Sequence, residues 1–406
     1  MARSERVEFD GAFGDRLAAR LERPSGVPRA FALFAHCFSC SKDILAATRV
    51  SQRLARQGIA VLRFDFTGLG HSDGEFSNTN FSSNIEDLVQ AAAFLAEHHE
   101  APRLLIGHSL GGAAVIAAAH RIASVQAVVT IGAPADADHV RKQFNAQLDE
   151  IEETGSANVS LAGRPFRITR QFLRDIEGRS LEDAAATLKK PILIAHSPVD
   201  ETVNIENATR LFVAAKHPKS FLSLDHSDHL LSGKDDARHV ADVIAAWAER
   251  YAAEDRLPEP PRAVPQGVVV QETRQGKFQN WVVDGDDIGL TDEPESYGGL
   301  GSGPTPYGQL SAALGACTSM MIRMYADRKS WPLERVTVTV KHNKDHADDC
   351  AHCGEEKRKV DIFERTIRLE GDLDAEQLDR LMEIADRCPV HRTLHEPVVV
   401  RTTRAS

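Results

Sequence analysis

Short apolar runs alternate with longer amphipathic runs from Arg29 to Tyr251, and this alternation constrains the fold more than any other feature of the chain. It is typical of a mostly parallel sheet covered by helices on both faces. The spacing therefore predicts a doubly wound α/β domain. Its predicted strands are Ala30–Ala35, Ala60–Phe66, Leu104–Ile106, Ala127–Ile131, Ile192–His196 and Phe221–Leu224, and its predicted helices are Lys42–Gln57, Asn84–His98, Leu110–His120, Ile205–Lys216 and Asp235–Tyr251.

Residues 136–188 interrupt the alternation with charged helix-like runs around a hairpin-like segment, Val159–Ile168. An insertion at this point of such a sheet would lie above its carboxyl edge, where ligands bind. We predict a small cap there. A polar stretch with four prolines, 255–265, can neither continue a helix nor join the interior of a sheet, and it predicts a semi-rigid linker. The first domain is therefore expected to end at residue 254.

The pattern changes after the linker, and residues 266–406 are expected to form a second domain. Its short strands come before and after one long helix, which favours an α+β fold over a second doubly wound sheet. The predicted strands are 267–272, 277–283, 335–342 and 361–370, and the predicted helices are 309–328 and a further one from Asp374.

The composition of the chain bounds its partners. Its 406 residues exceed what one hydrophobic core usually serves, which agrees with two domains. The formal charge of -11 disfavours nucleic acid and anionic membranes as partners, because both attract basic surfaces. The start of the chain lacks the apolar core of a signal peptide, and no run reaches the ~18 apolar residues of a membrane span. We therefore expect a cytoplasmic protein that acts on small molecules.

One pentapeptide of the first domain marks a candidate active site. Gly107-His-Ser-Leu-Gly111 follows an apolar run and precedes an alanine-rich one, so it stands at a strand-to-helix turn. The flanking glycines allow the sharp bend that lifts a serine hydroxyl above a sheet, and the new helix directs its first amides at the same point. Ser109 is thus the predicted nucleophile. The N–H of Leu110 is the predicted first oxyanion donor.

A serine nucleophile needs a histidine base that is held by a carboxylate, and in this kind of fold both follow later in the chain. Asp200 comes after the predicted strand Ile192–His196, in a loop at the edge of the sheet. His229 comes after the next predicted strand. The order and the places of these residues predict Asp200 as the acid and His229 as the base.

Rivals for both roles lie close to His229. His226 is a rival base, but an apolar pair directly after His229 would anchor the latter at the head of the last helix, so His229 is favoured. Asp225 and Asp228 are rival acids. A carboxylate so near in sequence cannot easily reach the Nδ1 atom of His229, and Asp200 is therefore favoured.

The second oxyanion donor is expected in the loop after the first predicted strand. The N–H of Phe38 is the predicted donor, and that of Cys37 is the alternative. This loop, the turn Gly107–Gly111 and the segment Arg63–Ser72 resemble the α/β-hydrolase superfamily. The resemblance extends from Arg29 to Tyr251. It implies a serine esterase or acyl hydrolase that cleaves ester, thioester or amide bonds of a small acyl substrate through an acyl-enzyme.

Two cysteines of the second domain stand in distinct contexts. Cys388 precedes Pro389, which suits the first position of a new helix, and a cysteine at a helix N-terminus favours the thiolate. Cys317 lies in the long predicted helix, where its spacing predicts a place in a buried apolar stripe. The other members of that stripe are Leu310, Leu314, Met321 and Met324.

Four motifs of the second domain resemble the OsmC/Ohr family, and the resemblance spans Gln266 to Thr403. It implies an intertwined homodimer that reduces organic hydroperoxides with electrons from a thiol or dihydrolipoyl reductant. It also implies that Cys317 is the peroxidatic cysteine and Cys388 the resolving one. The motifs are Gly303–Tyr307, Leu314–Thr318, Tyr325–Lys329 and Cys388–Arg392.

Two interpretations of the second domain stay open at this point. Either it is a thiol peroxidase, which makes the protein bifunctional, or it is a non-catalytic dimerisation or ligand-binding module. Cys350-Ala-His-Cys353 supplies only two thiolates, so a solvated hairpin tip is favoured over a zinc site. Nearby histidines that could add ligands are His342, His346 and His352. We expect no metal and no cofactor.

Overall fold

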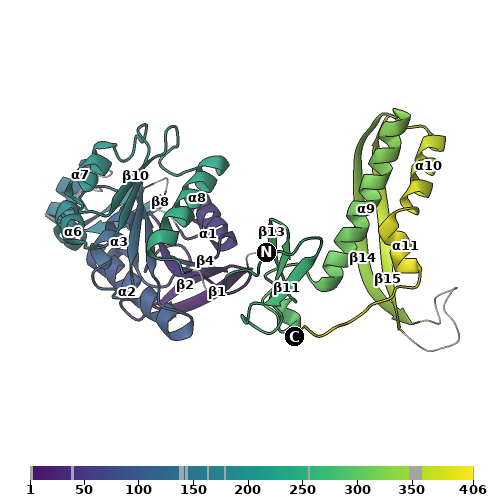
Figure 1. The fold of residues 1–406 in the computed structure, drawn as a ribbon. Coiled ribbons are helices and arrows are strands. Elements are labelled where there is room, and N and C mark those ends of the chain that lie inside the picture. The colour runs from purple at the N-terminus through teal and green to yellow at the C-terminus, as the bar shows by residue number, and fades with distance from the viewer. Residues whose placement is uncertain are drawn as a thin grey trace. The chain divides into compact units, whose positions relative to one another are not determined.

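The computed structural model describes residues 3–37, 41–136, 141, 145–161, 164–177, 180–254, 257–346 and 359–405. The chain divides into two compact units, Met1–Glu259 and Pro260–Ser406 (Figure 1). The division falls within the proline-rich stretch. Among the described residues, no helix combines the length and the apolar character that a membrane crossing requires.

The first unit is built on an eight-stranded sheet with the strand order β1-β2-β4-β3-β5-β6-β9-β10 (Figure 1). The strands from β4 to β10 are parallel, whereas β1 and β2 form an antiparallel hairpin that extends one edge. The central strands are buried along their whole length, as both faces of a parallel sheet must be. The bounds are β1 Arg3–Asp10, β2 Arg16–Arg23, β3 Ala30–Ala35, β4 Ile59–Phe64, β5 Leu104–His108, β6 Ala127–Ile131, β9 Ile192–His196 and β10 Lys219–Ser223.

Helices cover both faces of this sheet, which confirms the doubly wound α/β fold. Helices α1 (Leu45–Arg56) and α8 (Lys234–Tyr251) share one hydrophobic core with one face. The second core lies on the opposite face, under α2 (Phe81–His98), α3 (Leu110–Ala118), α6 (Leu181–Thr187) and α7 (Glu206–Ala214). A short 3₁₀ helix, Phe76–Asn78, precedes α2.

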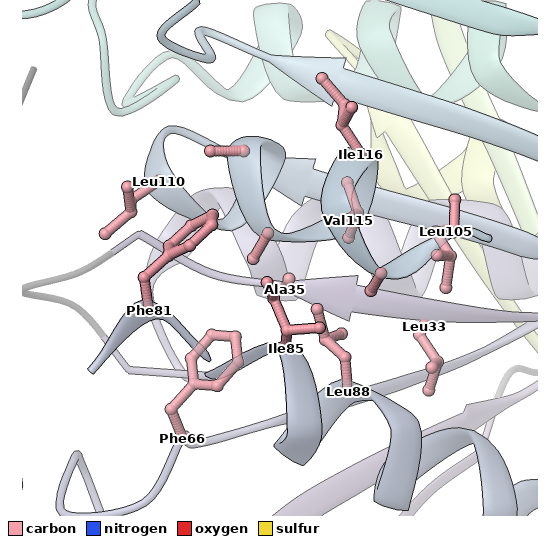
Figure 2. Close-up of a cluster of buried hydrophobic side chains, with 14 of the residues drawn as sticks. Leu33, Ala35, Phe66, Phe81, Ile85, Leu88, Leu105, Leu110, Val115 and Ile116 are labelled. Atoms are coloured by element: carbon pink, nitrogen blue, oxygen red, sulfur yellow. The ribbon is translucent and has the colours of Figure 1, made fainter. Parts of the chain in front are cut away.

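The packing of α2 and α3 on the sheet explains why these segments become helices. Helix α3 is apolar on nearly all sides and almost entirely buried, because it lies between the sheet and its helical neighbours. Figure 2 shows Ile85 and Leu88 of α2 and Val115 of α3 in the same apolar cluster as Leu33 and Leu105 of the strands. Helix α2 begins where a capping box satisfies its first amides.

The predicted cap is an insertion between β6 and α6. Its described elements are α4 (Leu148–Thr154), the hairpin of β7 (Ser156–Leu161) and β8 (Arg164–Thr169), and α5 (Arg170–Ile176). The hairpin lies where the sequence predicts one. An isolated bridge between Asp136 and Ser180 joins the two ends of the insertion. Apolar side chains of α5 pack into the core that α2 and α3 share.

The second unit is α+β, as predicted. Strands β11, β12 and β13 form an antiparallel sheet, and β14 and β15 form a long hairpin against which the helix α9 packs. Helix α9 begins at Pro306, with Thr305 as its N-cap. The bounds are β11 Val268–Glu272, β12 Asn280–Asp284, β13 Asp287–Thr291, a 3₁₀ helix Glu295–Tyr297, α9 Pro306–Lys329, β14 Leu333–His346, β15 Lys359–Gly371, α10 Ala375–Ala385 and α11 Pro389–His395.

The buried face of α9 differs from the predicted stripe. Leu310 and Met324 are 44% and 67% exposed in the single chain, so within the second unit they do not belong to a buried stripe with Cys317, contrary to the prediction. The periodicity identifies apolar positions of a helix, but the neighbouring elements decide which of them are covered. Here β14, α10 and α11 pack on the side of α9 that carries Leu314, Gly315, Thr318, Ile322 and Ala326.

Candidate active sites

Ser109 lies at the sharp turn between β5 and α3. Its backbone has φ 55 and ψ -125, a combination that side-chain-bearing residues rarely adopt. The neighbouring strand β6 holds the turn in place, because the N–H of Ser109 donates to the carbonyl oxygen of Ile131 at 2.8 Å. The strained turn therefore presents the serine at the carboxyl edge of the sheet.

The two glycines of the pentapeptide permit this turn by close backbone contact. A Cβ atom on Gly107 would lie 2.3 Å from the carbonyl oxygen of Gly111. A Cβ atom on Gly111 would lie 2.3 Å from the carbonyl oxygen of Ala35, at the end of β3. Both distances are far below van der Waals contact, and the obstacles are backbone atoms. Only glycine fits at either position without displacing the start of α3.

The structure brings Ser109, Asp200 and His229 into one hydrogen-bonded chain. The Nε2 atom of His229 lies 3.0 Å from the Oγ atom of Ser109. Its Nδ1 atom lies 2.7 Å from the Oδ2 atom of Asp200. Both distances are within hydrogen-bond reach, so one imidazole can take a proton from the serine while the carboxylate orients the ring.

The carboxylate of Asp200 is held in its ionised form. Burial opposes ionisation, but the hydrogen bond with His229 and the amides of Val203 and Thr202 outweigh it, and the pKa of Asp200 is lowered. Its Oδ1 atom accepts both amides at 2.8 Å, which leaves Oδ2 for the imidazole. Gly132 lies against the same pair, and a Cβ atom there would be 3.3 Å from both Asp200 Oδ2 and His229 Nδ1.

The rival residues are engaged elsewhere. His226 is exposed on the loop after β10. Asp225 accepts a hydrogen bond from the hydroxyl of Ser223, and Asp228 accepts one from the amide of Ser232. None of the three rivals takes the place of Asp200 or His229 beside Ser109.

Two buried histidines support this site, and the sequence did not single them out. His108 Nε2 lies 2.7 Å from the carbonyl oxygen of His229, and His196 Nε2 lies 2.7 Å from that of Val203. A carbonyl can only accept, so both nitrogens carry hydrogen. Burial and the neighbouring His229 lower the pKa of His108 to about 4, and burial also lowers that of His196. The sequence signal that could have pointed to His108 is its place within the pentapeptide Gly107–Gly111.

Of the two predicted oxyanion donors, Leu110 and Phe38, the structure describes Leu110. Leu110 is the first residue of α3, directly after the serine, so its amide belongs to the start of that helix. Phe38 lies outside the described residues. Cys37, the alternative, is buried after β3.

A buried ionic cluster holds Lys42, which follows β3 in the chain. The Nζ atom of Lys42 lies 2.9 Å from the Oδ2 atom of Asp65, which is fully buried after β4. Arg63 of β4 pairs with Glu22 of β2 at 2.9 Å and also contacts the carbonyl oxygen of Lys42. Isolated charges at such buried positions would be strongly unfavourable, so each requires its partner. The cluster thereby ties Lys42 to β2 and β4.

Cys317 and Cys388 form the candidate site of the second unit. Cys317 lies on α9 and is half-buried, and Cys388 is fully buried as the N-cap residue of α11, as predicted. Both are free thiols, and their side chains are hydrogen-bonded to each other. Burial raises the pKa of Cys317. Burial also disfavours the Cys388 thiolate, but hydrogen bonds from Cys317, from the His391 amide and from other neighbours outweigh it and lower the pKa of Cys388.

The cysteine pair with metal-ligand spacing, Cys350 and Cys353, lies outside the described residues, as does His352. His342 stacks on Tyr307 and lies 2.8 Å from a carboxylate oxygen of Asp361. In the part of the chain that the structure describes, no group of three histidine, cysteine, aspartate or glutamate residues could hold a metal ion.

Two family models match the chain, one in each unit. Residues 27–154 match the model of the serine aminopeptidases, S33, and residues 299–403 match that of the OsmC-like proteins. The esterase domain of a Rhodothermus marinus protein has a solved structure that is 52% identical, with a TM-score of 0.52, over 61% of this chain and 99% of that domain.

Curated relatives also match the first unit. The monoacylglycerol lipase of Mycolicibacterium smegmatis is 24% identical over 61% of this chain and 98% of the relative. Palmitoyl-protein thioesterase ABHD10, mitochondrial, of mouse is 29% identical over 39% of this chain. The match spans about half of that relative, 54% of its length. Both relatives are hydrolases of acyl bonds by name.

Proposed function

This chain belongs to the α/β-hydrolase superfamily through its first unit and to the OsmC-like proteins through its second, and from this premise we propose that it is bifunctional. The first unit is a hydrolase of the esterase and lipase type. Its proposed reaction is the cleavage of small ester or thioester substrates through an acyl-enzyme on Ser109. The proposed reaction of the second unit is the reduction of organic hydroperoxides.

The proposed hydrolysis starts at the hydroxyl of Ser109. His229 takes its proton as the serine oxygen attacks the substrate carbonyl, and Asp200 stabilises the imidazolium that forms. The amides of Leu110 and Phe38 are the proposed donors to the oxyanion. The alcohol or thiol leaves with the proton from His229. Water then attacks the carbonyl of the acyl-enzyme while His229 takes a proton from it. His229 returns this proton to the oxygen of Ser109 as the acid is released.

The observation that carries this proposal is the hydrogen-bonded chain from Ser109 through His229 to Asp200. Its distances of 3.0 and 2.7 Å fit proton transfer without rearrangement. The proposed substrate class follows from the names of relatives that match the first unit, a monoacylglycerol lipase and a palmitoyl-protein thioesterase. Ester and thioester carbonyls are attacked by the same serine, so one site suits both.

Ser109→Ala tests the hydrolase proposal. We expect the hydrolysis of p-nitrophenyl esters to fall by roughly 10⁴-fold or more, because the triad acts as a unit. Labelling by a fluorophosphonate should disappear with it. Ser51→Ala is the matched control, since Ser51 is a buried serine of α1. Full labelling of folded Ser109→Ala would exclude this residue as the nucleophile.

The proposed chemistry of the second unit uses both of its free cysteines. The sulfur of Cys317 attacks an oxygen of the organic hydroperoxide, the O–O bond breaks, and an alcohol leaves with the proton that Cys317 loses. Cys317 becomes a sulfenic acid. The sulfur of Cys388 then attacks that of Cys317, so that a disulfide forms and water is released. A dithiol such as a dihydrolipoyl group, or two thiols, would restore the reduced pair.

Peptide mapping after mild treatment with an organic hydroperoxide tests this second reaction. We expect a Cys317–Cys388 disulfide in the unmodified protein, and sulfenic or sulfinic acid at Cys317 in Cys388→Ser. The peptides with Cys350 and Cys353 serve as an internal control for unrelated oxidation. If Cys317 and Cys388 stay reduced, the peroxidase proposal is wrong. The OsmC-like unit is then a dimerisation or ligand-binding module.

A further inference from the structure

In the part of the chain that the structure describes, the side chain of His108 makes a single hydrogen bond, and its partner is the proposed base. His108 is the last residue of β5 and is fully buried. Its Nε2 atom lies 2.7 Å from the carbonyl oxygen of His229, and the two rings lie with their centroids 5.1 Å apart. Its Nδ1 atom is buried without a partner among the described groups.

The hydrogen bond fixes the form of the His108 ring. A carbonyl oxygen can only accept, so Nε2 carries the hydrogen. Burial keeps the imidazole neutral, and Nδ1 is therefore a bare acceptor. A buried acceptor without a partner costs stability, and an apolar side chain of the same size would avoid this cost. The bond to His229 is thus what distinguishes a histidine from an apolar residue at this position.

The loop that carries His229, between β10 and α8, has a backbone that needs to be held. Asp225 and Leu231 have φ angles of 35 and 49, in the left-handed region that residues with side chains rarely adopt. Such a conformation persists only where the surrounding structure enforces it. The bond from His108 holds the carbonyl group of His229 between these two positions.

The end of β5 presents two consecutive residues to His229. His108 donates to the carbonyl oxygen of His229, and Ser109 lies 3.0 Å from its Nε2 atom. Strand β5 is buried along its whole length between β3 and β6, so its end is a rigid support. The bond from His108 therefore sets the main chain of the base relative to the nucleophile itself.

The loop of the acid is held in the same manner from another strand. His196 is the last residue of β9 and is fully buried. Its Nε2 atom lies 2.7 Å from the carbonyl oxygen of Val203, whose amide donates to the Oδ1 atom of Asp200 at 2.8 Å. Each of the two loops that bring a residue to Ser109 is thus tied by a buried histidine at a strand end.

We propose that His108 is a positioning residue of the hydrolase, because its N–H holds the main chain of His229 and so keeps the imidazole of His229 within hydrogen-bond reach of the Ser109 oxygen. His108 gives and takes no proton in the reaction. Without this bond the loop relaxes, and the imidazole of His229 spends less time where it can accept the serine proton. This inference rests on the proposed hydrolase function and deepens it.

The test removes the donor and then restores it. His108→Leu keeps a buried side chain of similar size, and we expect kcat for p-nitrophenyl acetate to fall about 10²-fold, as for a catalytic group displaced by about 1 Å. KM should change by less than about threefold, since the base acts in the chemical step. His108→Gln should restore most of the rate, because its amide reaches the same carbonyl.

A second pair of amides keeps the test decisive if His108→Leu does not fold. His108→Asn is as polar as His108→Gln but one methylene shorter, so its amide does not reach the carbonyl oxygen of His229. We expect His108→Asn to be slow where His108→Gln is fast. Equal kcat values in these two variants would contradict the proposal.

The pH profile separates positioning from proton transfer. The loss in His108→Leu should be the same factor at pH 7 and at pH 9, because His108 is neutral throughout this range. A loss that varies between these pH values would show that His108 takes part in proton transfer, and it would overturn the proposal.

Leu95→Ala is the control for lost stability. Leu95 of α2 is fully buried, and its truncation leaves a cavity that lowers the free energy of unfolding. It should leave kcat unchanged at a temperature where the variant is folded. If Leu95→Ala loses as much kcat as an equally destabilised His108→Leu, the loss reflects stability and the proposal is wrong.

A measurement without substrate distinguishes the failure of this inference from that of the proposed hydrolase. The proton between His229 and Asp200, whose atoms lie 2.7 Å apart, gives a low-field NMR resonance. It should be the same in the unmodified protein and in His108→Gln, and shifted or lost in His108→Leu. If Ser109→Ala remains fully active while this resonance responds as expected, the hydrolase proposal falls and the positioning of His229 stands. If Ser109→Ala is inactive but folded His108→Leu keeps both kcat and the resonance, the inference is wrong and the hydrolase proposal stands.

Discussion

Four histidines of the first unit lie near the proposed catalytic serine, and their burial separates their roles. His36, His108 and His196 are fully buried, and burial lowers the pKa of each. His229 alone combines a hydrogen bond to Ser109 with one to a carboxylate. The buried three act as neutral donors to backbone groups or as packing, whereas His229 is placed to take and return a proton.

The titration of His108 predicts how the stability of the first unit depends on pH. Its folded-state pKa of about 4 lies below the ordinary histidine pKa of 6.5. As the pH falls below 6.5, His108 binds a proton in the unfolded chain, whereas in the folded chain it stays neutral until about pH 4. The free energy of unfolding therefore decreases over this window. His108 alone should account for about 2 kcal/mol between pH 7 and pH 5.

Urea unfolding of His108→Gln at pH 7 and pH 5 measures this contribution. Glutamine keeps a donor for the carbonyl oxygen of His229 but does not titrate. The variant should lose about 2 kcal/mol less than the unmodified protein between the two pH values. The remaining loss in the variant includes the same effect from His36 and His196. Equal losses in both proteins would contradict a neutral, buried His108.

The first turn of α3 packs directly on the end of β3. Gly111→Ala would place a Cβ atom 2.3 Å from Ala35 O and 2.5 Å from His36 O. These are backbone atoms of a buried strand end, so the helix must move. We expect a loss of about 3 kcal/mol in the free energy of unfolding. Esterase activity should fall as well, since Ser109 starts this helix.

Gly289→Ala provides the comparison, because no atom lies within 4 Å of the position of its Cβ. It should change the midpoint of thermal unfolding very little. If Gly111→Ala is as stable and as active as Gly289→Ala, the close approach of α3 to β3 does not constrain the site.

The sequence predicted the buried elements well and the edge elements poorly. Strands β3, β6 and β9 have the predicted bounds, because continuous apolar runs mark strands that are buried on both faces. The hairpin of β1 and β2 was not predicted. In β2, the buried Leu17, Ala19 and Leu21 alternate with the less buried Arg16, Ala18 and Arg20, which is the period-two signal of a half-covered strand. The short β13 carries even less signal, because it is mostly exposed.

In the candidate sites, the residues that have a local sequence signal could be predicted, and those that only tertiary packing brings together could not. Ser109 could be predicted because its turn needs glycines at fixed spacing, and the later Asp200 and His229 follow from chain order. The hydrogen bonds of Arg365 on β15 with Thr318 of α9 and with Asp386 could not be predicted, because only tertiary packing brings these elements together. Helical spacing likewise could not reveal which face of α9 is covered.

The exposed apolar side chains of α9 predict that the protein associates with itself. Met320 and Met324 of α9 are 64% and 67% exposed, and Leu310 is 44% exposed. Apolar side chains gathered along one helix in this way usually contact another surface. A second copy of the chain is the expected partner, by the same resemblance that assigns the cysteines. We expect a dimer at micromolar concentration, measured as molar mass by light scattering.

Met320→Glu combined with Met324→Glu should shift this dimer to the monomer, because two charges would have to be buried in the contact. Val213→Glu is the control, since Val213 is 72% exposed on α7 of the first unit. A monomeric mass for the unmodified chain at the same concentration would contradict the prediction.

The bridge between Asp136 and Ser180 brings the two ends of the cap insertion together, next to the hydrogen bond from the Leu181 amide to the Ala135 carbonyl. A segment whose ends already meet can be replaced during evolution without rethreading a single strand of the sheet. We expect that exchanging this insertion would change which substrates the proposed active site accepts and leave Ser109, Asp200 and His229 in place. In the laboratory, the same junction marks where a cap from a relative could be grafted.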